Sequence, residues 1–297
     1  MPLDNSIIGF DMAGKPASWT VVSTMSTFVL LWASAAIFSR WALNHGAVFA
    51  VLIIRFSLAL CGTVLIGLTE KRLLPKPGTR WQVAGTGLLM IGGYSVFYFQ
   101  AMSHGITPGL LATILGVQPI LTLMLTERQF SPWRLLGLLL ALGGLVLVVY
   151  QSLILAKLSG LGVVLSICAL ACVTFGTLLQ KRIQQAPSEV LPLQYSVALL
   201  LCLCFVPFQP FHFEISADFL IPALWLGLVI SVGSQFLLYR MIRSGNLVNV
   251  TSLLYLVPLV TVILDYLILG NTMPMLAMVG MAAILAGLIL VFKPRRS

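Results

Sequence analysis

Long runs of apolar residues, separated by short polar stretches, recur ten times along the chain. Most runs are about 20 residues long, the length an α-helix needs to cross the hydrocarbon core of a membrane. The pattern predicts ten membrane-spanning helices. They are expected near residues 20–39, 47–68, 82–103, 106–125, 133–150, 160–180, 190–207, 219–239, 247–268 and 274–292.

The ten runs divide into two similar halves. A shift of 140 residues superimposes glycines of the third run on those of the eighth, and a shift of 143 gives six identities in twelve between the segments that begin at Gly137 and Gly280. Because five is odd, the second half must enter the membrane from the opposite side. We therefore expect an all-α membrane protein with ten transmembrane helices arranged as two inverted five-helix repeats.

The same pattern sets the expected domain boundaries. The first repeat spans residues 20–150 and the second spans 160–293, joined by a linker at 151–159. Cytoplasmic tails are expected at 1–19 and 294–297. The linkers leave no room for a soluble domain, and only 69–81 and 208–218 are long enough to form substantial loops.

Composition and charge agree with a membrane protein. Apolar residues make up 59% of the chain and charged residues 8%, far from the balance of soluble domains. The net charge of +9 does not indicate a nucleic-acid partner, because fourteen of the seventeen Lys and Arg residues fall in even loops or tails, where they face anionic lipid. The positive-inside rule then places both termini in the cytoplasm of a multi-pass protein in the cell inner (plasma) membrane.

Four parts of the sequence carry a family resemblance: LLWASAAIFSR at 30–40, RFSLA at 55–59, PGLLATILGVQP at 108–119, and the glycine-containing fifth and tenth runs. They resemble the drug/metabolite transporter superfamily in its ten-helix EamA-type branch, and the resemblance covers residues 20 to 293. It implies the fold and the transport class but no substrate. Where family members often carry a glutamate after the ninth span, this chain has Asn271, and its first and sixth spans contain no acidic residue. Proton-coupled cation antiport through such a carboxylate is therefore disfavoured.

Arg55 is the basic residue expected within a span, where a charge is expensive and by default functional. Its guanidinium is suited to a substrate carboxylate, which accepts two parallel hydrogen bonds. The alternative is a structural role, in which the side chain reaches the interface or bonds backbone carbonyls. Near the outer end of the ninth span, Asp265 is a candidate for proton coupling or for an interfacial role.

Polar and aromatic residues also form stripes on corresponding helices of the two halves. Tyr94 and Tyr98 lie one turn apart in the third span, as do Ser231, Gln235 and Tyr239 in the eighth. Facing inward, they would bind a small zwitterionic or amphipathic solute; facing neighbouring helices, they would serve packing.

Three further candidates lie near the expected middle of the membrane or beside a proline. Trp32 is expected either in a cavity wall or in the core of the first span. Gln118 precedes Pro119 and Tyr255 precedes Pro258, and a proline frees a backbone carbonyl one turn earlier. Each proline predicts a ligand acceptor or a hinge, with a simple kink as the alternative.

The leading interpretation is a secondary transporter that exports a small metabolite, an amino acid or a related compound, by alternating access. The alternatives are an exporter of toxic amphipathic compounds and a non-transporting scaffold or receptor. We expect no catalytic residue, metal or cofactor: the sequence has no Walker A loop, HExxH or GxSxG motif, and the cysteines lie within spans. Membrane lipid and a small-molecule substrate are the expected partners, and a homodimer through the glycine-containing fifth and tenth spans remains open.

The loop charges generate a topology prediction. Reporter fusions placed after Lys15 and after Ser297 should both report a cytoplasmic location, because translocating fourteen positive residues opposes the positive-inside rule. Two reporters exposed on the outer face would contradict this topology.

Overall fold

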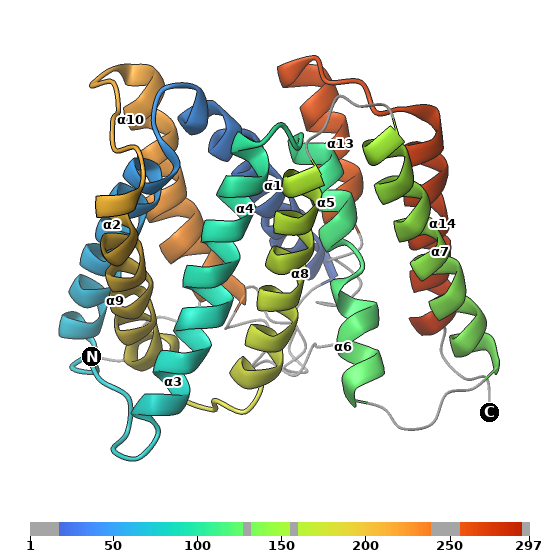
Figure 1. The fold of residues 1–297 in the computed structure, drawn as a ribbon. Coiled ribbons are helices and arrows are strands. Elements are labelled where there is room, and N and C mark those ends of the chain that lie inside the picture. The colour runs from blue at the N-terminus through green and yellow to red at the C-terminus, as the bar shows by residue number, and fades with distance from the viewer. Residues whose placement is uncertain (1–17, 127–131, 155–159, 239–255, 293–297) are drawn as a thin grey trace.

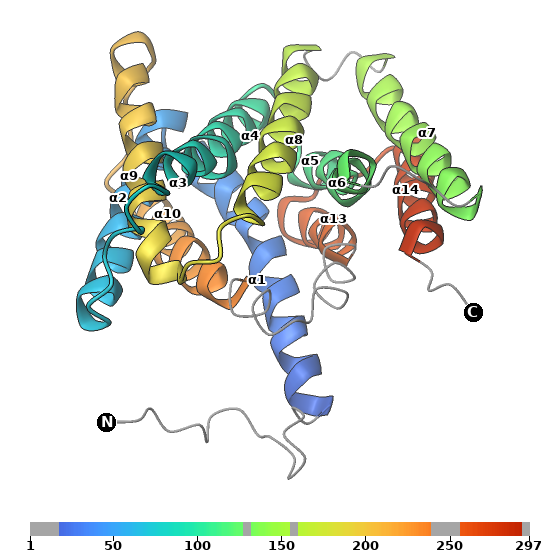
Figure 2. The same ribbon diagram turned by 90° about the horizontal axis from the view of Figure 1, so that it is seen from below.

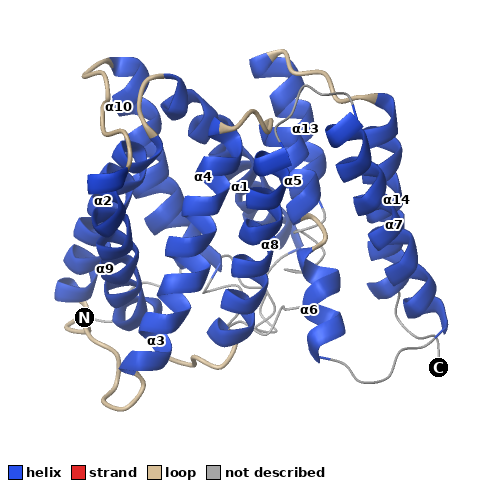
Figure 3. Ribbon diagram, in the orientation of Figure 1, coloured by secondary structure: helices blue, strands red, loops and turns tan. Residues whose placement is uncertain are grey.

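The fold is helical throughout the part of the chain that can be described. The computed structural model describes residues 18–126, 132–154, 160–238 and 256–292. Within these ranges the helices are joined by loops, with a single isolated β-bridge between Gly46 and Phe213 (Figures 1 and 3). The prediction of an all-α protein is confirmed.

The helices of the first half follow the expected order (Figure 1). They are α1 (Ser18–Asn44), α2 (Val48–Thr69), α3 (Arg80–Gly87) with η2 (Leu88–Gly93) and α4 (Tyr94–Ser103), α5 (Pro108–Leu115) with α6 (Gln118–Thr126), and α7 (Pro132–Ile154).

The second half repeats this order. Its helices are α8 (Gly160–Gln180), α9 (Pro187–Phe205) with the short η3 (Val206–Phe208), α10 (Ala217–Leu224) with η4 (Trp225–Ser234), α13 (Leu256–Leu269) and α14 (Met275–Phe292). The predicted start of the ninth span lies outside the described residues.

Length and composition support a membrane location for these helices. Among the described residues, five helices are long and apolar enough to cross a membrane, and four shorter apolar helices accompany them. Many of their large apolar side chains are exposed, including Leu139, Val146 and Ile289. In water such a surface would be costly, whereas lipid solvates it.

The two halves pack on each other in a reciprocal way. Helix α1 of the first half packs on α13 of the second, and α8, its counterpart, packs on α5 and α6. Likewise α2 contacts η4, while α9 contacts η2 and α3. Viewed from below, α1 crosses the middle of the molecule, with α10 on one side and α13 on the other (Figure 2). Each half thus completes its core with helices from the other, as inverted repeats do.

Glycines at equivalent positions of the two halves make two of these contacts possible. A Cβ on Gly87 would lie 2.6 Å from the Cα of Gln194 in α9, and a Cβ on Gly227 would lie 2.7 Å from the Cβ of Leu58 in α2. The two glycines are 140 residues apart, the shift that aligns the halves. The third and eighth spans therefore approach the opposite half at equivalent points.

The sequence pattern predicted regular α-helices for the third and eighth spans. The structure shows that neither span is regular. Each contains a π-helical segment, η2 in the first half and η4 in the second. The wider π turn changes which side chains share a face, so a stripe drawn at α-helical spacing does not continue through it. That both halves carry a π segment at related positions is an independent sign of their common plan.

The fourth span, predicted as one helix, is interrupted. Helix α5 ends at Leu115 and α6 begins at Gln118, with Gly116 and Val117 between them. Pro119 has no N–H and cannot donate to the carbonyl of Leu115, which explains a break at this point.

Arg40 directly follows the predicted end of the first span at residue 39, a position that would place it in an outer loop. Helix α1 continues to Asn44, so Arg40 lies within the helix. Its Nη1 donates a hydrogen bond to the backbone carbonyl of Met102 at 2.9 Å, joining α1 to the end of α4. The guanidinium satisfies a carbonyl near a helix end and is not a free loop charge.

Helices α7 and α14, the fifth and tenth spans, stand together at one side of the molecule (Figures 1 and 2). A Cβ on Gly144 would lie 2.5 Å from the carbonyl oxygen of Gly280, and one on Gly287 would meet the carbonyl oxygen of Gly137. The contacts are reciprocal because the residues are equivalent in the two repeats. Small residues at this interface let the two backbones touch.

We expect Gly144→Val to reduce the free energy of unfolding by about 1–3 kcal/mol, because the added side chain must push α14 away. Thermal denaturation of the purified protein in detergent measures the change. Gly143→Val is the matched control, since a Cβ at the neighbouring Gly143 meets nothing within 4 Å. Equal losses in the two variants would contradict a specific contact at Gly144.

Candidate functional site

Arg55 lies in α2, where it faces the opposite half of the molecule. Its Nε donates a hydrogen bond to the hydroxyl of Ser231 in η4 at 2.9 Å. The guanidinium carbon also lies 5.8 Å from the centre of the Phe56 ring and 5.9 Å from that of Phe99. The charge is therefore held at the interface between the two repeats by one hydrogen bond and two aromatic rings.

The terminal amino groups of Arg55 are the most informative feature of this site. Among the described residues, neither Nη1 nor Nη2 has a hydrogen-bond partner, and the side chain is only half-buried. A guanidinium carries five N–H donors, and its two Nη groups form the fork that matches a carboxylate. The geometry leaves donors of this kind accessible inside the helix bundle.

Three tyrosines lie close enough to interact electrostatically with the Arg55 guanidinium: Tyr94, Tyr98 and Tyr195. The Tyr94 and Tyr98 rings contact each other with their centres 5.5 Å apart. Tyr94 directly follows the π-helical segment η2, and Ser231 lies within η4. The two irregular segments thus both contribute to the surroundings of Arg55.

Tyr195 was missed by the sequence analysis. It is fully buried in α9, and its hydroxyl donates a hydrogen bond to the backbone carbonyl of Ser231, the residue whose side chain binds Arg55. A weak signal existed: a shift of 139 residues aligns residues 47–60 with 186–199 at six identities and places Tyr195 opposite Phe56. The same alignment pairs Arg55 with Gln194.

Gln235 and Tyr239 were expected on the same stripe as Ser231. Gln235 follows η4, and its Oε1 is buried without a hydrogen-bond partner among the described residues. Tyr239 lies outside the described residues, and so does Tyr255. The structure brings Ser231 to Arg55; the substrate role of Gln235 stays a prediction.

Trp32 and Gln118 lie elsewhere, in contacts between helices. The Trp32 ring lies 5.2 Å from Phe28, in a small cluster of buried residues with Val29 and Leu238. Gln118, at the start of α6, donates from Nε2 to the hydroxyl of Thr177 in α8 at 3.0 Å. Both side chains contact residues of the second half, and a substrate role for either remains untested.

Asp265 lies in α13 with only 3% of its surface exposed. Its Oδ2 accepts a hydrogen bond from the backbone N–H of Gly109 at 2.7 Å, and its Oδ1 accepts one from the Asn271 side-chain amide at 2.8 Å. Gly109 is in the first turn of α5, where backbone N–H groups lack partners within the helix. The carboxylate therefore caps a helix of the other repeat, and Asn271 holds it in place.

Both halves of the chain match one known protein family. The model of the EamA-like transporter family matches residues 19–150 and again residues 160–293. The chain belongs to this family, and it is a multi-pass membrane protein of a transporter family built from two repeats. No curated protein matches the chain.

One solved structure, titled "Crystal structure of protein", has a TM-score of 0.60 and 18% identity to this chain. The match covers 90% of this chain and 95% of the other. At this identity the likeness shows the fold alone. Both chains therefore share an architecture over nearly their whole length.

A prediction for Asp265 follows from its two hydrogen bonds. Asp265→Ala should lower the free energy of unfolding by about 1–3 kcal/mol, because the buried N–H of Gly109 loses its acceptor. Asp265→Asn retains a side-chain oxygen and should lose less. Chemical denaturation in detergent measures both, with Asp218→Ala, an exposed carboxylate in the first turn of α10, as control.

The same pair of variants separates capping from proton coupling. A capping carboxylate predicts that transport falls only in proportion to the amount of folded protein. Loss of transport in Asp265→Asn at normal stability and abundance would instead assign the charge of Asp265 to coupling.

Proposed function

We propose that this protein exports a small metabolite that carries a carboxylate, an amino acid or a related compound, from the cytoplasm across the inner membrane. Membership of the EamA-like transporter family supports the transport class. The single observation that carries the carboxylate is the pair of unpartnered, accessible Nη groups of Arg55 among the described residues. A charge in a membrane-spanning helix is costly, so a ligand that neutralises it is favoured.

The surroundings of Arg55 support an amphipathic ligand. The aromatic rings of Tyr94, Tyr98 and Phe99 offer apolar faces near the guanidinium, while Tyr hydroxyls offer hydrogen bonds. A carboxylate on the guanidinium and an apolar portion against the rings would use both features. Hydroxyl and amide groups of Tyr94 and Gln235 are candidates for the remaining polar groups of the ligand.

The inverted arrangement of the halves supports alternating access as the mechanism. Arg55 comes from the first half and its partner Ser231 from the second. A movement of one repeat against the other would change this contact, so binding at Arg55 and rearrangement of the halves would be linked. Export, in place of uptake, rests on analogy within the family.

The aromatic residues also support the second candidate, an exporter of toxic amphipathic compounds. The positive charge of Arg55 disfavours cationic compounds within that class, because like charges repel in a site of low dielectric. A non-transporting scaffold or receptor is the remaining alternative. Flux of a bound solute in proteoliposomes would distinguish a carrier from a non-transporting scaffold or receptor.

The test begins with purified protein in lipid nanodiscs, screened by thermal shift against L-amino acids and their methyl esters. We expect acids to stabilise the protein and the matching esters to fail, because an ester lacks the negative charge and its alkoxy oxygen is a weak acceptor. Arg55→Lys should weaken binding of the stabilising acid by roughly tenfold to a hundredfold, since an ammonium lacks the planar fork.

Arg40→Lys is the matched control. Arg40 uses one amino group for one backbone carbonyl, a bond that a lysine can replace. Acid binding should therefore survive in this variant. If Arg55→Lys retains the full preference of the wild type for acid over ester, Arg55 does not bind the carboxylate.

A further inference from the structure

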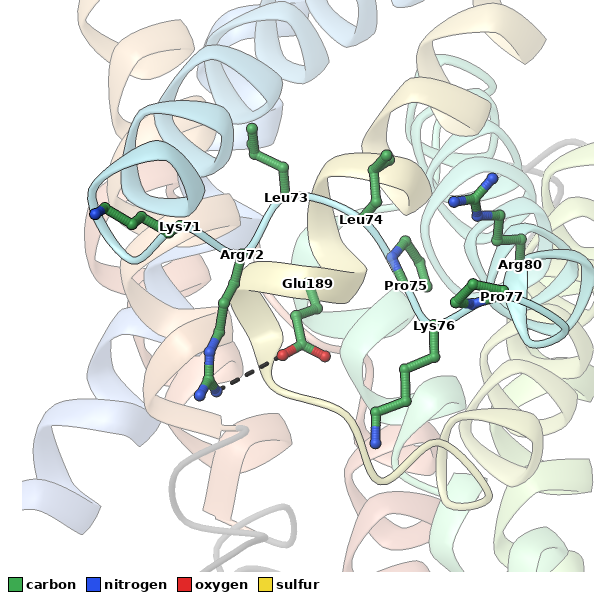
Figure 4. Close-up of a pocket in the computed structure, with 9 residues that line it drawn as sticks. All are labelled: Lys71, Arg72, Leu73, Leu74, Pro75, Lys76, Pro77, Arg80 and Glu189. Carbon is green, nitrogen blue, oxygen red and sulfur yellow. Dashed lines mark ion pairs between the residues drawn. The ribbon is translucent and has the colours of Figure 1, made fainter.

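A cluster of positive charges lies where α2 ends and α3 begins, at the end of the bundle that the loop charges predict to be cytoplasmic. A pocket of about 490 Å³ is formed by this loop and the first turn of α9 (Figure 4). It is lined by Lys71, Arg72, Leu73, Leu74, Pro75, Lys76, Pro77, Arg80 and Glu189. Four cations against one carboxylate leave an excess of three positive charges.

The single carboxylate does not neutralise the cluster. The Arg72 guanidinium lies 3.6 Å from Glu189, an ion pair too long for a good hydrogen bond. In the view of Figure 4, Arg72 and Lys76 extend on the same side of the loop, with Glu189 between them. Lys71, Lys76 and Arg80 are exposed and have no ion pair among the described residues. The pocket therefore has several charge-assisted donors available for an anion.

The loop is held in shape by contacts that do not use these cations. The Gln185 side chain, from the loop between α8 and α9, accepts a hydrogen bond from the Lys76 backbone N–H and donates one to the Thr79 hydroxyl, both at 2.8 Å. The Thr79 hydroxyl in turn donates to the carbonyl of Lys76 at 2.9 Å. The backbone of the loop is thus ordered before any ligand arrives, which removes one part of the entropic cost of binding.

Lys71 occupies a backbone conformation that favours glycine. Its φ is 54°, and the N–H of Arg72 bonds the carbonyl of Gly67 at 2.8 Å, closing the end of α2. Glycine is the usual residue at this position of a helix end, because it has no Cβ. A lysine here carries a cost in stability and supplies a positive side chain to the pocket.

Apolar side chains beside the cations distinguish between possible anions. Leu74 is 62% exposed and Trp81, next to Arg80, is 90% exposed. A soluble anion would gain little from contact with these apolar groups. A phospholipid would contact both, because its phosphate lies close to its acyl chains, and Trp residues are enriched at the interface between membrane and water. The pocket also lies at the ends of membrane helices, at the depth of the headgroups.

We propose that this pocket binds the phosphate of an anionic phospholipid in the cytoplasmic leaflet. Lys71, Lys76 and Arg80 extend in different directions from the loop (Figure 4), so their exposed side chains turn toward the headgroup phosphate on binding, and the glycerol and upper acyl chains contact Leu74 and Trp81. The site is separate from Arg55, so it stands whether or not the proposed substrate is correct.

The test uses full-length protein purified in detergent and titrated with short-chain phosphatidylglycerol, phosphatidylcholine or inorganic phosphate, with binding measured by native mass spectrometry and thermal shift. Phosphatidylglycerol should bind more tightly than phosphatidylcholine. Lys76→Gln with Arg80→Gln should weaken its binding by about tenfold or more, because each basic residue adds to the attraction for anionic lipid. Arg72 is left intact so that Glu189 keeps its partner.

Lys181→Gln with Arg182→Gln is the matched control. It removes two exposed positive charges from a neighbouring loop that does not line the pocket, so binding should stay within about twofold of the wild type. A second variant, Lys71→Gly, should weaken lipid binding while leaving the protein as stable as the wild type or more stable. This outcome separates loss of a contact from loss of the fold.

Three results would overturn the proposal. Equal weakening by the two double variants would show that overall charge, not this pocket, attracts the lipid. Equal affinity for phosphatidylglycerol and phosphatidylcholine would exclude recognition of an anionic headgroup. Stabilisation by inorganic phosphate that matches that of phosphatidylglycerol would assign the pocket to a soluble anion.

Discussion

A positive charge within the membrane-spanning part of the bundle, the guanidinium of Arg55, constrains how the two halves pack, because it lies where they meet and must be satisfied there. Ser231 binds its Nε, and Tyr195 fixes the backbone of Ser231 through a second hydrogen bond. Helices α2, α9 and η4 are therefore linked through one node. Among the described residues, the Nη groups of Arg55 have no hydrogen-bond partner. The contact between Arg55 and Ser231 therefore leaves donors available to an anionic group.

The two halves share a plan but differ in chemistry where they meet. The alignment that superimposes α2 on α9 pairs Arg55 with Gln194, whose amide donates to Gln180 at 2.8 Å. One repeat thus contributes a charge and the other a neutral amide at equivalent positions. The interface between the repeats is therefore chemically asymmetric, although the two backbones share one plan.

Loops close the molecule at both ends in equivalent ways. On one side, His45 lies 3.1 Å from Glu214, and the backbones of their loops pair across the β-bridge. On the other side, Gln185 binds the loop that follows α2. Each contact joins the first connection of one repeat to the second connection of the other, so the two contacts are equivalent. The basic pocket lies beside Gln185, at one of the two points where loops of the repeats are joined.

The sequence by itself determined the helical class, the approximate spans, the duplication and the transporter family, because apolar length, loop charge and repeated glycines are local or periodic properties of the chain. Tertiary structure alone decided the rest. The partners of Arg55, the capping of α5 by Asp265 and the place of Tyr195 depend on residues more than 100 positions apart or on helices of opposite repeats. The π-helical segments and the break at Gly116 changed the faces that a regular helix would present. Apolar periodicity records which segments enter the membrane, whereas the direction of each polar side chain is set by the packing of the two halves.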